Sequence, residues 1–210
     1  MPPRFSAGAD WSGKPYETGD LFLFCVVALS DVAAWDETCG EIRRKLRMTQ
    51  GQEFHGHKMK GDSQRLELLQ AGQNAGMRVG VFISHNKNIE AETKANKKVA
   101  LTHQGVALDL LSRFLPLCPL QIFWFDEGDL KGKKAEKAFA TQVCRLNRTF
   151  YPTLRLEARC RKAEDKNLIQ LADVMAYSFR TQERGTLKNP QLKSLLKEIE
   201  EDERNLIIRG

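Results

Sequence analysis

One short stretch of the sequence restricts the fold more than any other. "LQIFWFD" at 120–126 is apolar on both faces of an extended chain, and it is too short to be a long core helix. A strand of this kind has to be covered on both sides, which is typical of the central strands of an α/β sheet. The longest apolar run, "LFLFCVVAL" at 21–29, is also of strand length. The chain is therefore expected to have a layered α/β fold.

Strand and helix patterns alternate along the rest of the chain. Strands are predicted at 4–11, 20–29, 77–84, 120–126 and 153–159. Helices are predicted from a cap at Ser30 or Asp31 to Leu46, and at 91–115, 133–149, 168–180 and 190–207. No repeat and no linker rich in Pro, Gly or Ser divides the 210 residues. We expect a single domain over 1–210, with a core at about 5–180 and a C-terminal helix at 190–207.

The charge of the chain indicates a polyanionic partner. A formal net charge of +6 is concentrated in clusters such as "RRKLR" (43–47), "KGKK" (131–134) and "RCRK" (159–162). Such clusters bind nucleic acid, although each of them also fits a solvated helix face. No apolar stretch approaches a membrane span, and Glu17 and Asp20 stand where a signal peptide would carry positive charge. A cytoplasmic protein without a membrane partner is expected.

Four acids stand at positions where α/β proteins form sites. Asp126 ends the most apolar strand, Asp10 closes the first one, and Glu53 lies in "QEFHGHK". Asp173 borders the apolar face of the helix at 168–180, where Ala172 and Ala176 allow close approach to a sheet. If the four acids converge, each pair at about 4 Å repels by roughly 4 kcal/mol. Bound Mg²⁺ or Mn²⁺ would neutralise them, because these ions prefer oxygen ligands.

Two such ions would suit phosphodiester hydrolysis, since they activate water and stabilise the leaving oxygen. Ser12, His55 and Lys58 are candidates for contacts to the substrate, and His55 or Lys58 could also relay a proton beside Glu53. A zinc site at His55 and His57 lacks a third soft ligand nearby in the sequence. The P-loop spacing in "GADWSGK" fails because Pro15 replaces the required Ser or Thr.

The order of elements and acids resembles the ribonuclease H-like fold, and more closely the bacterial domain of unknown function 3800 family. The segments that carry the resemblance are "DWSG" (10–13), "EFH" (53–55), "FDEGD" (125–129) and "IQLAD" (169–173). The resemblance implies a mixed sheet of about five strands with helices on both faces. It also implies that Asp10, Glu53, Asp126 and Asp173 are the metal-binding acids of a nuclease-like site, with Gln170 supporting Asp173. Trp11 departs from the family, which usually has Glu there.

Three functions are compatible with these features. The first is a nuclease or related phosphodiester hydrolase that depends on Mg²⁺ or Mn²⁺, with two ions and a nucleic-acid substrate. The second is a non-catalytic protein that binds nucleic acid or acts as a scaffold, which the Trp11 departure favours. The third is an enzyme that acts on a small phosphorylated substrate or nucleotide in the same site. The sequence alone does not decide between them.

Overall fold

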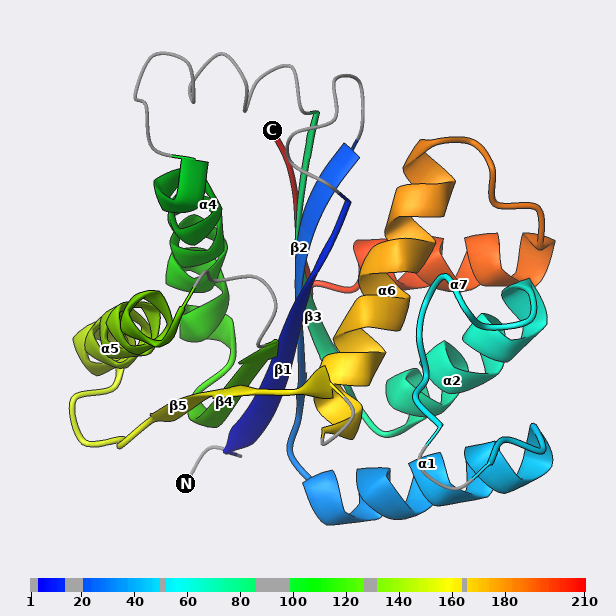
Figure 1. The fold of residues 1–210 in the computed structure, drawn as a ribbon, viewed down its shortest axis with the longest axis horizontal. Helices are drawn as coiled ribbons and strands as arrows, with labels where there is room; N and C mark the ends of the chain where they lie inside the picture. Colours follow the sequence, from blue (N-terminus) through cyan, green and yellow to red (C-terminus); the bar gives the residue numbers. More distant parts are fainter. Residues whose placement is uncertain (1–3, 14–20, 50–51, 86–98, 127–131, 164–165) are drawn as a thin grey trace.

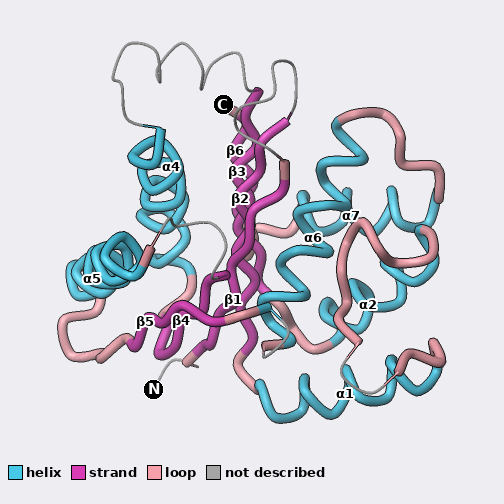
Figure 2. The backbone as a smooth tube through the Cα atoms, viewed as in Figure 1, coloured by secondary structure: helices cyan, strands magenta, loops and turns pink. Residues whose placement is uncertain are grey.

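The fold is a mixed sheet between two layers of helices (Figures 1 and 2). The structure is a computed structural model, and it describes residues 4–13, 21–49, 52–85, 99–126, 132–163 and 166–210. Its elements are β1 (Phe5–Ser12), β2 (Leu21–Leu29), α1 (Val32–Lys45), α2 (Asp62–Asn74), β3 (Arg78–His85), α4 (Val99–Phe114), the 3-10 turn η1 (Leu115–Leu117), β4 (Leu120–Asp126), α5 (Lys133–Phe150), β5 (Glu157–Arg161), α6 (Asn167–Glu183), α7 (Pro190–Glu201) and β6 (Leu206–Arg209).

The strand order is β5-β4-β1-β2-β3-β6. β1, β2 and β3 pair antiparallel, whereas β4 runs parallel to β1 and β5 runs parallel to β4. Every residue of β2 is buried, as the apolar run at 21–29 predicts for a strand covered on both sides. The α/β class and the helices on both faces are thus confirmed.

The alternation of side chains along the strands divides the core into two halves. On one face Ala7 and Ala9 of β1 pack with Phe123 of β4 under α4 and α5. On the other face Cys25 and Val27 of β2 pack under α6, and α1, α2 and α7 lie outside α6. We refer to these as the α4/α5 face and the α6 face of the sheet.

The α6 helix approaches the sheet closely because β1 has a glycine where the two meet. A Cβ atom added to Gly8 would lie 2.3 Å from the backbone carbon of Leu168. Ala172 and Ala176 are both fully buried in the same helix. The close approach of this helix to the sheet is therefore confirmed, and on the sheet the residue at the contact is Gly8.

The C-terminal segment differs from the prediction. The helix predicted at 190–207 ends at Glu201, and Leu206–Arg209 forms the edge strand β6, parallel to β3. Asn205 stabilises this exit, because its side chain accepts the N–H of Val79 and donates to the carbonyl of Ile199. The sheet has six strands instead of about five, and the core extends beyond residue 180 because α7 contributes Leu192, Leu195, Leu196 and Ile199.

Two further elements depart from the sequence patterns. The predictions omitted α2, and the strand predicted at 153–159 is observed at Glu157–Arg161. The described part of the predicted helix at 91–115 is α4, and residues 86–98 lie outside the described residues. No helix in the described ranges combines the length and the apolar character needed to cross a membrane.

Candidate functional site

Asp126 ends β4, and Asp10 lies two residues before the end of the adjacent parallel strand β1, not at its end as predicted; both lie on the α6 face. The register pairs Gly8 with Trp124 and Ala9 with Phe125, so that its continuation by one residue sets Asp10 opposite Asp126. Gly8 faces α6, and Trp124 packs against the core under α6, so both acids two residues further on share that face. Neighbouring strands lie about 4.8 Å apart. Oδ1 of Asp126 accepts the backbone N–H of Ala163 at 3.1 Å.

Asp173 faces the segment that carries Glu53 and His55. Its Oδ2 lies 2.7 Å from Nδ1 of His55 and accepts the backbone N–H of Gly56 at 2.9 Å. The chain can come this close to α6 only with glycine at position 56, since an added Cβ would lie 2.4 Å from Cβ of Tyr177. The Asp173 side chain is 14% exposed, so these contacts are shielded from water but still within reach of a ligand.

The contact with Asp173 raises the pKa of His55 above its usual value. Partial burial opposes this increase, and the carboxylate of Glu53 adds to it. The neighbouring His57 has the opposite behaviour: partial burial and the His55 ring, 4.2 Å away, lower its pKa. The His55 ring thus contacts Asp173, and the carboxylate of Glu53 is near enough to act on it, whereas His57 is an exposed neighbour.

The thiol of Cys25 shows that Asp10 and Asp173 lie near the same point of the sheet. Cys25 is the register partner of Asp10 on β2, and it is fully buried under α6. Burial raises its pKa well above the usual value, and the carboxylates of Asp10 and Asp173 raise it further. Asp10 and Asp173 thus both lie near the Cys25 thiol on the α6 face, which Asp126 shares, and Glu53 lies in the segment that contacts Asp173 through His55 and Gly56.

Gln170 connects the segments around these acids. Its Oε1 accepts the N–H of Phe54 at 2.9 Å, and its Nε2 donates to the carbonyl of Ala163 at 2.9 Å. Phe54 lies between Glu53 and His55, and Ala163 holds Asp126. Gln170 therefore positions the segments beside Glu53 and Asp126, whereas the resemblance assigned it to Asp173 alone.

Arg43 is the residue that the sequence analysis missed. Helical spacing puts it on the solvent side of α1, but its guanidinium donates to Gln170 Oε1 at 2.9 Å and to Asn167 Oδ1 at 2.6 Å. It also lies over the ring of Phe54, 4.4 Å from the centroid, and donates to the carbonyl of Gln52 at 3.1 Å. No pattern within α1 marks this role, because its partners come from distant segments.

Trp11 and Ser12 lie on opposite faces of β1. The Trp11 ring packs against Phe24 in a tilted arrangement, 4.2 Å between centroids, and lies against the core of the α4/α5 face. The Trp at this position therefore does not replace a side chain on the face of Asp10. Ser12 is in phase with Asp10 along β1 and is 7% exposed, which leaves little of it open to a substrate.

The donors present fit a hard divalent cation in chemistry, because all four predicted ligands are carboxylates. The side chains do not form a closed cage: within the described ranges, no three His, Cys, Asp or Glu side chains come together closely enough to hold a metal ion. The carboxylate of Asp173 instead contacts the His55 ring and accepts the N–H of Gly56. A metal ion held by three of these acids together would need their side chains closer to one another than they are here.

The strand order and the placement of α6 define a ribonuclease H-like fold, and solved structures share it. A chain from the structure of the PCNA:RNase HII complex from Archaeoglobus fulgidus matches with a TM-score of 0.58 and 19% identity, over 92% of this chain and 87% of that one. The ribonuclease H2 from Pyrococcus horikoshii OT3 matches with a TM-score of 0.58 and 14% identity, over 92% and 86% of the two chains. The sequence matches no protein-family model and no curated protein. The likeness to the domain of unknown function 3800 family stays a prediction.

Proposed function

We propose that the protein is a divalent-metal-dependent nuclease of ribonuclease H-like type. The observation that carries the proposal is that the register of the parallel strands β1 and β4, continued by one residue, sets Asp10 opposite Asp126 on the face of the sheet that α6 covers. A cation bound between two carboxylates in this position would relieve their mutual repulsion. Two basic residues suit a phosphodiester substrate: Arg161 is the register partner of Asp126, and Lys58 lies near His55.

Asp10, Glu53, Asp126 and Asp173 would hold the ions, Mg²⁺ or Mn²⁺, in this proposal. Bound there, the ions would activate a water and stabilise the leaving oxygen. The chain supplies the rest. Gln170 and Arg43 hold the backbone beside Glu53 against α6. Asp173 fixes the Nδ1 side of His55, which leaves Nε2 as the ring nitrogen that can give a proton to the substrate.

A cleavage assay tests the proposal. Labelled RNA, DNA and RNA–DNA hybrid are incubated with the protein in Mg²⁺, Mn²⁺ or EDTA. We expect cleavage with either metal and none in EDTA. The cleavage rate of Asp126→Asn should be at least about 100-fold lower than that of the wild type, because loss of a metal ligand should cost at least as much as loss of a residue that only supports a ligand. Asp109→Asn on α4, 43% exposed and on the opposite face of the sheet, is the matched control. Equal cleavage by Asp126→Asn and the wild type would contradict the proposal.

The main alternative is a non-catalytic protein that binds nucleic acid or acts as a scaffold. The absence of a closed three-ligand group among the described residues favours it. The Trp11 departure no longer does, because this side chain faces away from the acids. In this case the assay would show no cleavage with any metal. A separate binding measurement would show affinity for nucleic acid that weakens as the salt concentration rises. An enzyme acting on a small phosphorylated compound or a nucleotide would instead leave all three nucleic acids intact and unbound.

A further inference from the structure

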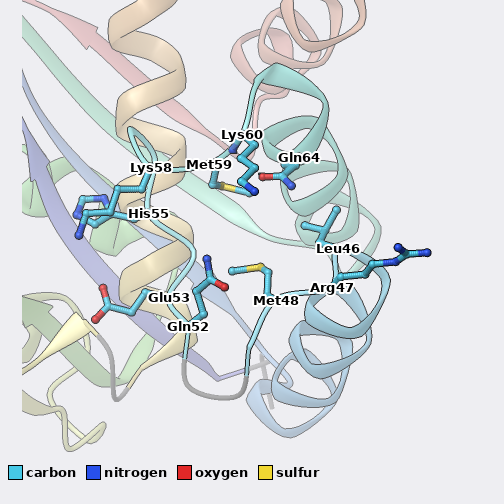
Figure 3. Close-up of a pocket in the computed structure, with 10 residues that line it drawn as sticks. All are labelled: Leu46, Arg47, Met48, Gln52, Glu53, His55, Lys58, Met59, Lys60 and Gln64. Carbon is cyan, nitrogen blue, oxygen red and sulfur yellow. Dashed lines mark hydrogen bonds between the residues drawn. The ribbon is translucent and has the colours of Figure 1, made fainter.

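A cleft opens beside the acids, between the end of α1, the segment 52–60 and the start of α2. Its volume is about 310 Å³, and its inner end is formed by Glu53 and His55 (Figure 3). Lys58 lies close to His55, with Glu53 directed to the same side, whereas the guanidinium of Arg47 points the opposite way. The cleft thus continues directly from the candidate site.

Hydrogen-bond donors dominate the polar lining. Gln52 and Gln64 each use their side-chain oxygen inside the protein: Gln52 Oε1 accepts the N–H of Thr49 at 3.2 Å, and Gln64 Oε1 accepts the N–H of Lys60 at 2.7 Å. These bonds orient both side-chain amides so that their NH₂ groups remain as donors. Lys58 and Lys60 are exposed and add two ammonium groups. Among the described residues that line the cleft, Glu53 is the single carboxylate.

The floor of the cleft is apolar. Leu46, Met48 and Met59 line it, and Met59 is 8% exposed. Methionine side chains adapt to irregular apolar surfaces such as the face of a sugar. A ligand that fits this lining has acceptor oxygens on its outer side and an apolar side against the floor.

The end of α1 has a strained backbone that shapes this floor. Arg47 has a φ of 53°, in the left-handed region that glycine usually occupies at the end of a helix. The N–H of Arg47 bonds to the carbonyl of Arg44 at 3.1 Å, and that of Met48 bonds to Arg43 at 2.9 Å, which closes the helix. This reversal turns the chain so that Met48 lines the cleft. Strained positions of this kind occur often at ligand sites.

We propose that this cleft binds the sugar–phosphate backbone of the nucleic-acid strand, on one side of the reacting phosphate. Phosphodiester oxygens accept hydrogen bonds and carry negative charge, as the amides and lysines require, and sugars present an apolar face to the methionines. The contacts are independent of base sequence, because donors that meet phosphate read no base edge. The inference rests on the proposed function for the position of the reacting phosphate.

The experiment compares binding by Lys58→Gln/Lys60→Gln with the wild type. Fluorescence anisotropy with labelled single-stranded RNA, single-stranded DNA and hybrid oligonucleotides is measured in EDTA at several salt concentrations. Because two phosphate contacts are removed, we expect binding at least about tenfold weaker at 0.1 M salt and a salt slope reduced by about 1.4 to 1.8. The double variant Arg145→Gln/Arg148→Gln removes the same charge at exposed positions of α5, on the opposite face, and should bind like the wild type.

Three outcomes would overturn the inference. They are an unchanged affinity and slope in Lys58→Gln/Lys60→Gln, an equal loss in the α5 control, and a loss confined to one base sequence. Absence of any binding at low salt by the wild type would overturn it as well. Because the measurement is made in EDTA, it does not depend on cleavage. If the protein never cleaves but the double variant binds more weakly as expected, the nuclease proposal is wrong and the cleft proposal is supported. If the protein cleaves but the double variant binds like the wild type, the nuclease proposal is supported and the cleft proposal is wrong.

Discussion

Nδ1 of His55 lies 2.7 Å from Oδ2 of Asp173, and the same oxygen accepts the N–H of Gly56. One carboxylate on α6 thus holds the loop that carries both His55 and Glu53. Replacement of Asp173 by alanine removes both contacts, whereas asparagine keeps a side-chain oxygen that can accept from Gly56. A hydrogen bond to a charged group contributes about 1.5–3 kcal/mol.

Hydrogen exchange of the Gly56 amide should separate the two variants. We expect exchange about 10- to 100-fold faster in Asp173→Ala than in the wild type, and a much smaller change in Asp173→Asn. The amide of Ala75, bonded to Ala71 at the end of α2, is the internal control and should not change. Slow exchange of Gly56 in both variants would show that Asp173 does not hold the loop.

Asp62 should make the stability of the protein depend on pH. Burial alone would raise its pKa, but the N–H of Asn189, the Arg65 side chain and the N–H of Lys188 together lower it below the usual value of 3.8. An acid with a depressed pKa stabilises the fold above its unfolded pKa, and this contribution disappears as the pH falls through the folded value. The free energy of unfolding of the wild type should therefore exceed that of Asp62→Asn at pH 6–7 by more than it does near pH 3.

Urea denaturation at several pH values measures this difference. Glu41→Gln makes the same acid-to-amide change at an exposed position of α1 and corrects for the general effect of charge. A difference between wild type and Asp62→Asn that stays constant from pH 7 to pH 3 would show that the contacts to the segment before α7 do not depend on the ionised form.

Gly8 should tolerate a side chain poorly. The added Cβ of Gly8→Ala meets the backbone of Leu168 at 2.3 Å, and neither strand nor helix can move without disturbing the core. We expect a loss of at least about 1–3 kcal/mol in the free energy of unfolding. Gly40→Ala in α1 meets no atom within 4 Å and should stabilise the protein by about 0.5–1 kcal/mol. Equal stability of the two variants would mean that α6 does not pack on β1 as described.

The strands covered on both faces could be predicted because their pattern depends on burial alone. The runs at 21–29 and 120–126 became β2 and β4 at the predicted bounds, within one residue. The helix α1 was predicted from its cap, and Asp31 does accept the N–H of Ala34 at 3.0 Å. These signals are local, so no knowledge of partners is needed to read them.

The elements that were missed depend on distant partners. The buried face of α2 includes Arg65 and Gly72. Because neither residue is a typical core residue, the apolar residues of this segment do not show a clear helical spacing. Arg65 is buried because it pairs with Asp62, donates to the carbonyl of Gly56 and lies over the ring of Tyr177. The strand β5 starts at Glu157 instead of 153, since Leu154 and Leu156 bond through their carbonyls to Asn147 and Cys144 of α5.

The candidate site was predicted as a set of acids, and the structure adds how they are held. Strand ends and the border position of Asp173 were visible in the sequence, whereas the bonds of Gln170 and Arg43 join segments more than 100 residues apart. No sequence pattern indicates that the His55 ring contacts the carboxylate of Asp173. Which of the four acids bind a metal ion remains a prediction.

Binding of Mn²⁺, followed by electron paramagnetic resonance, tests the central claim most directly. The wild type is compared with Asp10→Asn/Asp126→Asn, and Asp109→Asn serves as the control away from the site. We expect saturable binding by the wild type and the control, and affinity at least about tenfold lower in the double variant. Equal affinity in all three proteins, or no binding by the wild type, would contradict the claim that Asp10 and Asp126 meet in order to hold a cation.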